Sequence, residues 1–595
     1  MSDNAALPGS LKSNPRLGQW LRMDPRGFAE ISPGKVEIGQ GILTALVQIA
    51  ADELDISPER VRLKAANTKY SPNEGVTSGS LSIQDSGSAL RHVCAEARAI
   101  YLALAAERLG AKSNALEIND GVIAGPDNLS TSYWELADDA LLDREATAGV
   151  KAKTPEARVI AGSSAARLDA PEKAFGLPRF IHDKYPADTL HGRLLRPPGP
   201  GATLISLDAS AAEKMDGVVS VVRDGSFAGI VATSEYAAIK ALDILRKGAA
   251  WREGAPLPDW HNLRDWIKSA PAESTVVAEK TSPAASKSAR TIRREFTRPY
   301  TAHASVGTSC ALARWENGKL EVWSHCQGIF NLRTDLALVF GMNQSDIAVE
   351  HMEGAGCYGH NGADDVGLDA ALLARAINGR IVRVVWSREE ELGWSPFSPG
   401  MVVAIEAYLD SDGEITAWRH DIWSNGHATR PGRGKTPTLL SGYYLAKPFP
   451  MEPAPASALS GGGGADRNAV PAYSFAGHRI THHRLLEMPV RVSAMRSLGA
   501  FANVFAIESM MDILAGERGE DPVAFRLRHL TDARARAVIE AAARRANWGK
   551  ATRTEGIGRG FGYAKYKNMG TGCAVVAEVE CGRDIRVRKL GRALN

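Results

Sequence analysis

Residues 327–391 read QGIFNLRTDLALVFGMNQSDIAVEHMEGAGCYGHNGADDVGLDAALLARAINGRIVRVVWSREEE. The pattern predicts a helix over 332–340 and a strand over 347–352. A loop with glycines at 354, 356, 359 and 362 follows, then a nearly all-apolar helix to residue 377 and a strand over 381–386. Glycine lets the backbone approach a ligand closely, and a helix amino terminus favours anions. The stretch therefore predicts an α/β ligand-binding loop, followed by a helix too apolar to lie at the surface.

The composition is that of an ordinary globular protein, because 44% of the 595 residues are hydrophobic and 23% are charged. A net charge of +3 argues against a protein that binds nucleic acid or an acidic membrane surface. The sequence has no apolar run long enough to span a bilayer and begins with no apolar signal segment. We therefore expect a cytoplasmic protein, associated with a membrane at most through partners.

The six cysteines are scattered and include no CxxC pair. This argues against a zinc site, a disulfide framework or an iron–sulfur cluster carried by this chain. It is typical of a protein from a reducing compartment.

The amino-terminal part alternates short strands and helices around two loops. Patterning predicts a hairpin over 17–38 whose second strand ends in Gly39-Gln40-Gly41, a helix over 43–54, a strand over 61–65, a long Ser/Thr/Gly-rich loop over 67–87, and a helix over 88–109 that ends at Gly110.

This order recurs later in the chain. The segment ELDISPERVRLKAANTK aligns without gaps on VFGMNQSDIAVEHMEGA, so that Leu54 falls on Phe340 and Val61 on Ile347. The alignment favours an internal repeat of helix, turn, strand, loop and helix, whose two copies could grip one ligand from both sides. The alternative is two unrelated α/β units of similar pattern.

Composition predicts linkers over 140–165 and 254–289, on either side of a small α+β region at 166–250. Downstream we expect strands over 291–323, a hairpin over 401–423, a loop-rich region over 428–470, a strand over 483–491, a helix after residue 495 with Phe505, Met510, Met511 and Leu514 facing inward, a helix over 533–546, a glycine-rich tail over 556–572, and a strand over 573–590.

Several residue patterns admit more than one chemistry. Gly354-x-Gly356-x-x-Gly359 lies in the context of a dinucleotide fingerprint, but the acidic residue expected about 20 positions later is missing. His325 beside Cys326 and the pair His482-His483 lack the spacing of metal ligands, which favours structural histidines.

Three other kinds of residue are candidates for a ligand site. Cys357 is a candidate nucleophile without an identifiable histidine partner, and a packing role is favoured. Gln40 and Gln327 flank glycines and offer both a donor and an acceptor to a polar ligand, or are solvated loop residues. Arg496, in a tight turn before a helix, suits a bidentate anion contact or is an ordinary surface arginine.

Four segments together resemble the molybdopterin-binding large subunit of the xanthine dehydrogenase/aldehyde oxidase family. They are KVEIGQGILTALVQIAADEL, PNEGVTSGSLSIQDSGSAL, GAGCYGHNGADDVGLDAALLARAINGRIVRVVWSREEE and MRSLGAFANVFAIESMMD. The VEIGQG segment precedes the small α+β region, and this permuted order resembles the group formed by the isoquinoline 1-oxidoreductase β subunit and the nicotinate dehydrogenase B subunit. No single motif is specific, but the combination runs from about residue 17 to about residue 590.

The resemblance implies an α+β fold. It predicts a large two-lobed molybdopterin-binding domain, formed by residues 1–150 and 291–595, with an α/β-hammerhead domain inserted at 166–250. It also implies a molybdenum–molybdopterin cofactor, in the cytosine dinucleotide form or without a nucleotide. The implied reaction hydroxylates an N-heterocyclic aromatic compound or an aldehyde, with water as oxygen source. Electrons would pass to a small partner subunit that carries [2Fe–2S] clusters, and onward to an acceptor such as a cytochrome.

By matching position, the resemblance places Gln327 and Arg496 at the metal pocket. The cofactor-binding residues that it implies are Gly39, Gln40, Gly41, Ser78, Gly79, Ser80, Ser82, Gly354, Gly356, Tyr358 and Gly359. The metal itself would be held by the pterin dithiolene rather than by side chains.

One family feature has no counterpart in the sequence. Family members carry a glycine-flanked glutamate near their carboxyl end as general base, and residues up to Asn595 include no glutamate in that context. We therefore expect a carboxy-terminally truncated chain. A catalytically inactive remnant that binds cofactor or a partner is the alternative function.

Overall fold

The computed structural model describes residues 7–549 and 554–594, and its mixture of helices and sheets is the predicted α+β fold. The chain forms two compact units. Unit 1 comprises Met1–Gly254, Ala304–Ser395 and Arg430–Met451; unit 2 comprises Ala255–His303, Pro396–Thr429 and Glu452–Asn595. The predicted domain boundaries at 150, 166, 250 and 291 stay predictions, and the expected truncation at Asn595 lies outside the described residues.

Unit 1 begins with a three-stranded sheet of order β1-β2-β3, packed with two helices. The elements are β1 (Leu21–Asp24), β2 (Phe28–Ile31), α1 (Ile42–Leu54), β3 (Val61–Leu63) and α2 (Ser88–Leu109). The predicted second strand of the hairpin is too long, because it ends at Ile31. The Ser32 amide still donates across the hairpin to the Trp20 carbonyl at 3.0 Å, but those of Gly34 and Lys35 donate to the Glu74 carboxylate at 2.7 and 3.0 Å.

Short elements follow α2 in unit 1. They are β4 (Glu117–Asn119), β5 (Val122–Ala124), β6 (Ser130–Ser132), α3 (Asp139–Leu142) and α4 (Ala170–Ala174). The linker predicted over 140–165 begins inside α3; its remainder, residues 143–165, contains no strand and only a short 3-10 turn.

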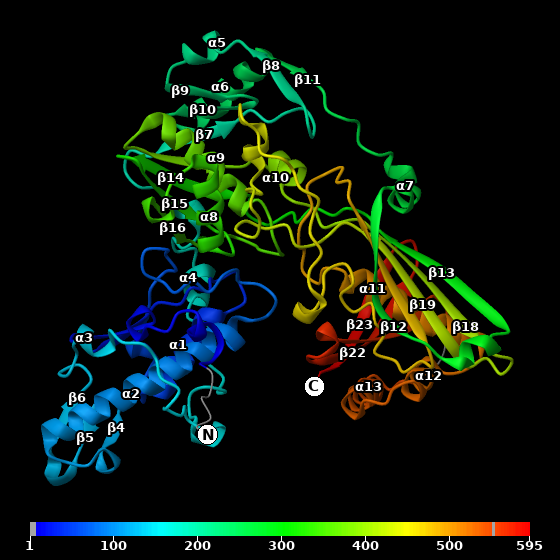
Figure 1. Ribbon diagram of the computed structural model, residues 1–595, viewed down its shortest axis with the longest axis horizontal. Helices are drawn as coiled ribbons and strands as arrows, with labels where there is room; N and C mark the ends of the chain where they lie inside the picture. The colour runs from blue at the N-terminus through cyan, green and yellow to red at the C-terminus, as the bar shows by residue number, and fades with distance from the viewer. Residues whose placement is uncertain (1–6, 550–553, 595) are drawn as a thin grey trace. The chain divides into compact units, whose positions relative to one another are not determined.

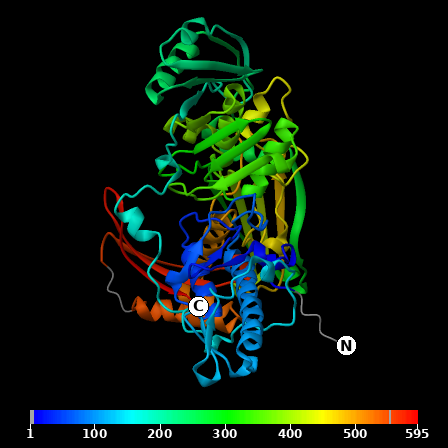
Figure 2. The same cartoon turned by 90° about the vertical axis from the view of Figure 1, so that its left-hand side faces the viewer.

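A seven-stranded sheet of order β16-β15-β14-β17-β7-β10-β9 forms the centre of unit 1 (Figures 1 and 2). Its strands are β7 (Leu190–Leu194), β9 (Val218–Asp224), β10 (Phe227–Ala232), β14 (Cys310–Glu316), β15 (Lys319–Ser324), β16 (Ile347–His351) and β17 (Ile381–Val385). Helix α9 (Ala363–Ile377) packs on β14, β15 and β17, and every residue from Ala363 to Ala374 is buried, as its apolar sequence predicts.

The region 166–250 contributes further elements to unit 1. Helix α5 (Ser210–Glu213) precedes β9, α6 (Glu235–Lys247) follows β10, and β8 (Thr203–Leu207) pairs with β11 (Ala249–Arg252). The strand predicted for FIHDKY is wrong. Residues Ile181–Asp183 form a 3-10 turn, because the Asp183 carboxylate accepts the amides of Arg179 and Phe180 at 3.0 and 2.8 Å.

The predicted internal repeat agrees with the element boundaries. Helix α1 ends at Leu54 and α8 (Ile329–Phe340) ends at Phe340, and each is followed by a left-handed residue, Asp55 or Gly341. Each copy then has a 3-10 turn, a strand (β3 or β16), a loop and a long helix (α2 or α9). The two copies therefore share one local architecture.

Unit 2 contains a five-stranded sheet of order β12-β20-β19-β18-β13. Its strands are β12 (Ala272–Lys280), β13 (Arg290–Arg298), β18 (Met401–Leu409), β19 (Ile415–Ser424) and β20 (His478–Leu485). The linker predicted over 254–289 is wrong, because it contains α7 (Leu263–Ser269) and β12, which pairs with β20. The strand predicted over 483–491 lies earlier, at His478–Leu485.

Helix α11 (Ala500–Glu517) packs on β13 and β18 (Figure 1). Met510, Met511 and Leu514 are buried as predicted. Phe505 is 60% exposed and was wrongly predicted to face inward; its ring meets Phe296 edge-on at the margin of the helix.

The last part of unit 2 consists of α12 (Pro522–Arg528), α13 (Ala533–Arg545) and a three-stranded sheet of β21 (Ile557–Lys565), β22 (Gly572–Cys581) and β23 (Ile585–Leu594). The glycine-rich tail is therefore partly a strand. Gly558, Gly560 and Gly562 alternate with larger residues, and Phe561 and Tyr563 point into the core.

Candidate functional site

The candidate site lies in unit 1, where loops from distant parts of the sequence are joined by hydrogen bonds. Gln327 lies between β15 and α8 and is 7% exposed. Its Nε2 donates to the carbonyl of Thr77 at 2.9 Å, and the Thr77 amide donates to the Gln327 carbonyl at 2.8 Å. Arg430 donates from Nη1 to Gln327 Oε1 at 2.8 Å. The predicted solvated alternative for Gln327 is therefore wrong.

The loop that contains Thr77 is held by a buried acid and a buried lysine. The Glu74 carboxylate accepts the Gly34 and Lys35 amides and the Ser86 hydroxyl, the last at 2.9 Å. Lys35 Nζ donates to the Glu74 carbonyl at 2.7 Å. These contacts fix the two ends of the predicted cofactor loop, whose members are Ser78, Gly79, Ser80 and Ser82.

The loop after β2 is shaped by Glu37, which is 2% exposed. Its carboxylate accepts the amides of Gly39 and Gly41 at 2.8 and 2.9 Å. The side chain of Gln40 closes on its own loop, since Oε1 accepts the Ile38 amide at 2.7 Å and Nε2 donates to the Val36 carbonyl. Part of the hydrogen-bonding capacity predicted for a ligand is therefore used within the loop.

The glycine-rich loop after β16 passes directly over His325. A Cβ placed on Gly354 would lie 2.5 Å from His325 Nδ1, so that only glycine fits there. Gly356 has a φ of 112°, and a Cβ there would lie 3.0 Å from the Tyr358 hydroxyl. Burial raises the pKa of the Cys357 thiol, whose Sγ contacts the Gly359 carbonyl, which supports a packing role over a thiolate nucleophile.

The end of β16 joins three of these segments. His351 Nδ1 lies 3.1 Å from the Cys326 carbonyl, and His351 Nε2 lies 3.1 Å from the Glu37 carbonyl. The two repeat copies also meet here, because the His351 amide donates to the Ala66 carbonyl at 2.8 Å and the Thr68 amide to the Val349 carbonyl at 3.0 Å. The copies therefore face each other at the candidate site, as the repeat predicted.

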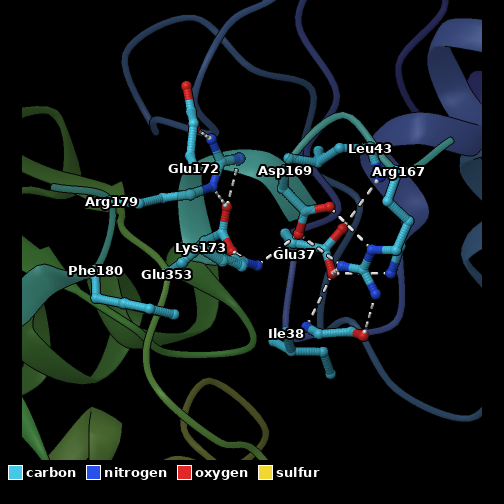
Figure 3. A network of polar contacts seen from close by, with 12 residues as sticks. Glu37, Ile38, Leu43, Arg167, Asp169, Glu172, Lys173, Arg179, Phe180 and Glu353 are labelled. Atoms are coloured by element: carbon cyan, nitrogen blue, oxygen red, sulfur yellow. Dashed lines mark hydrogen bonds and ion pairs between the residues drawn. The ribbon is translucent and has the colours of Figure 1, made fainter. Parts of the chain in front are cut away.

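A network of charges ties the segment around α4 to two of the loops (Figure 3). Arg167 donates to the Gly39 carbonyl at 2.9 Å and lies 3.7 Å from the Glu37 carboxylate. Lys173 and Arg179 pair with Glu353, just before the glycine-rich loop, at 2.5 and 2.7 Å. This segment links the loop at Gly39 to the loop at Gly354.

Arg496 belongs to unit 2, and its predicted proximity to Gln327 stays a prediction. It is exposed and begins a turn in which Ser497 and Leu498 have φ values of 77° and 54°. The buried Arg298 donates to the Leu498 carbonyl at 3.1 Å and supports this turn.

Sequence reasoning missed the residues that hold the loops, namely Lys35, Glu37, Glu74, Arg167, His351, Glu353 and Arg430. Glu37 and Glu74 lie within the quoted motifs, so that an acidic residue amid apolar and glycine neighbours was an available signal. Arg430 had no such signal, because its partner is 103 positions away.

His325 gives the site a pH-dependent stability. Its Nε2 accepts the Cys310 amide at 3.2 Å, and burial, reinforced by the neighbouring His182 and His351, lowers the pKa of His325 to about 3. In the unfolded chain, His325 binds a proton near pH 6.5. The contribution of neutral His325 to the free energy of unfolding is therefore complete above that pH and is lost as the pH falls. We expect a loss of about 2–3 kcal/mol by pH 4.5 from this residue.

Urea unfolding at pH 7.5 and pH 4.5 checks this expectation. A His325→Asn variant cannot titrate and is expected to lose about 2–3 kcal/mol less than the wild type between the two pH values. Equal losses in the two proteins would show that His325 is not the titrating group.

The topology argues against the dinucleotide fingerprint. Strands β16 and β17, which flank the glycine-rich loop and α9, are separated in the sheet by β15 and β14. A dinucleotide-binding βαβ unit requires its two strands to be parallel neighbours. In the residues that the structure describes, we also find no cluster of three potential metal-ligating side chains.

The histidines weighed as metal ligands have other contacts. His483 Nδ1 lies 2.7 Å from the Ser274 hydroxyl, and the ring stacks on Trp423. His482 Nε2 lies 3.4 Å from the Ser424 carbonyl.

Among the described helices, none is long and apolar enough to cross a membrane.

Known proteins are similar to this chain in sequence and in fold. The B subunit of nicotinate dehydrogenase from Pseudomonas putida is 35% identical over 95% of this chain, which spans 48% of that protein. The beta subunit of isoquinoline 1-oxidoreductase from Brevundimonas diminuta is 24% identical over 99% of the chain and 80% of the relative. Quinoline 2-oxidoreductase from Pseudomonas putida 86 has a similar fold, with a TM-score of 0.54 and 19% identity over 70% of this chain and 57% of that one.

Family models described as molybdopterin cofactor-binding domain match residues 5–166 and 270–445. These two segments include the loops at Gly39, Thr77, Gln327 and Gly354, and also Arg430. Because the matches cover more than half of the chain and contain the candidate site, the chain belongs to the molybdopterin cofactor-binding family.

Proposed function

We propose that this chain is the cofactor-binding part of a molybdenum hydroxylase large subunit. It would hydroxylate an N-heterocyclic aromatic compound of the nicotinate or isoquinoline kind, or an aldehyde, with water as oxygen source. The observation that carries the proposal is Gln327, which is buried and fixed at the junction of loops that lie within the two matched family domains.

The residues at the junction fit a molybdopterin cofactor. Thr77 uses one N–H of Gln327 Nε2, and the second is a donor for a ligand. Gly39 has open space where a Cβ would stand, which leaves its main chain accessible to a flat, polar ring system, whereas the absence of a side chain at Gly354 lets its loop pass close to His325. Arg430 adds a positive charge beside these loops, which suits an anionic group.

When bound, the cofactor supplies the redox chemistry at its metal. The protein's residues bind and orient it. Gln327 would donate its remaining N–H to the metal centre, and Arg496 would line the substrate pocket. The predicted cofactor contacts at Gly39, Gln40, Gly41, Ser78, Gly79, Ser80, Ser82, Gly354, Gly356, Tyr358 and Gly359 remain proposals. The buried network of Glu37, Glu74 and Lys35 holds their loops in place.

The finer assignments rest on the resemblance. We propose a cytosine dinucleotide form of the cofactor and a separate small subunit with [2Fe–2S] clusters that accepts the electrons. A cytochrome would be the onward acceptor, and the complex would be cytoplasmic, or attached to a membrane through partners. Two relatives are named as one subunit of a larger enzyme, the B subunit in one case and the beta subunit in the other, which supports a multi-subunit assembly.

An inactive remnant is the weaker alternative. A chain that had lost its function would no longer need buried polar side chains for binding. Such side chains would then tend to be replaced, because a buried polar group that is left unpaired costs about 1–3 kcal/mol. Gln327 is hydrogen-bonded to both Thr77 and Arg430, which favours the functional interpretation.

Turnover with labelled water tests the proposed reaction. The protein, purified with its iron–sulfur partner, is mixed with a dye acceptor and nicotinate, quinoline, isoquinoline or benzaldehyde in ¹⁸O-water. We expect dye reduction with at least one substrate and ¹⁸O in its product. A molybdenum-loaded protein that reduces no dye with any of the four would contradict the hydroxylase proposal.

A further inference from the structure

Arg430 is a buried cation with an unusual partner. Its side chain is 6% exposed, and its hydrogen bond runs to the neutral amide of Gln327. Among the described residues, no carboxylate forms an ion pair with it. Burial lowers the pKa of Arg430 to about 10, and the nearby Asp364 charge opposes this shift. A guanidinium is expensive to bury without a paired charge, so its contact with Gln327 needs an explanation.

The backbone that follows Arg430 is anchored by two side chains. Asn331 donates from Nδ2 to the Pro431 carbonyl at 3.0 Å, and Asp335 accepts the amides of Gly432 and Thr438, each at 2.7 Å. These anchors lie in α8, the helix that begins just after Gln327. Arg430 and Gln327 are therefore attached to the same rigid element.

The two contacts of Gln327 determine how its amide is oriented. A carbonyl oxygen such as that of Thr77 only accepts hydrogen bonds, and a guanidinium only donates them. Nε2 must therefore face Thr77, and Oε1 must face Arg430. The positive charge of Arg430 beside Oε1 also draws electron density from the Gln327 amide. The remaining N–H therefore becomes a stronger donor, because linked hydrogen bonds polarise one another.

We propose that Arg430 is a positioning residue, which orients and polarises the Gln327 amide so that it presents an N–H donor, and not an acceptor, to the cofactor. This inference rests on the proposed function. It adds a specific role for a residue that does not itself touch the reacting atoms. Partners of this outer kind change affinity or activity by roughly 10- to 100-fold when they are removed.

The test uses the paramagnetic resonance spectrum of the molybdenum centre in its one-electron-reduced Mo(V) state, because this readout needs no turnover. Wild type, Arg430→Met, Gln327→Leu and the double variant are compared at equal molybdenum content. We expect Arg430→Met and Gln327→Leu to shift the g-values in the same direction. The double variant should add no further shift, since each single change already removes the N–H donor that Gln327 presents to the cofactor.

Two further variants keep the test decisive. Arg433→Met, an exposed arginine of the same loop, is the matched control and should keep the wild-type spectrum. Arg430→Lys retains a cationic donor and is also expected to resemble the wild type, so that it serves if Arg430→Met fails to load.

The outcomes separate the two proposals. If the wild type is loaded with molybdenum and Arg430→Met keeps the wild-type spectrum, the positioning role is overturned and the proposed function stands. The same conclusion follows if a fully loaded Arg430→Lys protein has the spectrum of Gln327→Leu. If the wild type takes up no molybdenum, the proposed function fails and the positioning role falls with it.

Discussion

Replacing Gly354 by alanine is expected to destabilise unit 1 by about 1–3 kcal/mol and to lower its molybdenum content at least several-fold. The added Cβ would lie 2.5 Å from Nδ1 and 2.8 Å from Cβ of His325. His325 cannot move away easily, because it is 4% exposed and accepts the Cys310 amide. The glycine-rich loop must therefore shift away from the position that the cofactor would require.

The control for this change is Gly393→Ala in α10 (Arg388–Trp394), where a Cβ meets nothing within 4 Å. This variant is expected to leave molybdenum content unchanged and stability equal or slightly higher, because alanine favours a helix over glycine. Elemental mass spectrometry and urea unfolding measure both quantities. A Gly354→Ala protein with wild-type stability and metal content would show that the close approach to His325 is not required.

Replacing Arg526 by methionine is expected to destabilise unit 2 by about 3–5 kcal/mol, the cost of breaking a buried ion pair from one side. Arg526 is fully buried and bonds the Glu508 carboxylate at 2.9 Å and Asp512 at 2.7 Å. Glu508 also accepts the Tyr473 hydroxyl and the Tyr563 amide, and without Arg526 its buried carboxylate would lose its counter-charge.

Arg528→Met in the same helix is the matched control. Arg528 pairs with Glu414 and Glu520 at 3.0 and 3.3 Å, but its side chain is 36% exposed, and such pairs contribute at most about 1 kcal/mol. Adding Glu508→Gln to Arg526→Met is expected to recover part of the loss, because no uncompensated charge then remains. Urea unfolding measures all three proteins, and a loss below about 1 kcal/mol for Arg526→Met would contradict the account.

Strong periodicity made much of unit 1 predictable. The helix at Ser88–Leu109 and the helix that ends at Ile377 have the predicted ends, because apolar spacing and a stop residue coincide there. Elements failed where a distant partner or a misleading composition decided the structure. The Glu74 carboxylate accepts the amides of Gly34 and Lys35, which the predicted longer strand would have included. Strand β12 lies in a stretch whose Pro, Ser, Ala and Lys content is typical of a linker.

The candidate site was predictable only in part. Gln327 stood out because a glutamine beside a glycine at a strand end is a poor core residue, and the structure finds it buried and bonded. The residues that hold it were not predictable, since Thr77 and Arg430 lie 250 and 103 positions away. A single sequence contains local patterns, whereas these contacts depend on how distant segments of the chain meet.

The most direct test of the central claim is the amount of molybdenum and pterin bound per chain. The protein would be produced with its iron–sulfur partner in cells shown to make active molybdenum hydroxylases. Molybdenum would be measured by elemental mass spectrometry and pterin by the fluorescence of its oxidised product. We predict close to one of each per chain for the wild type and a large loss for Gly354→Ala. A wild-type protein with neither molybdenum nor pterin would contradict the claim that these loops hold the cofactor.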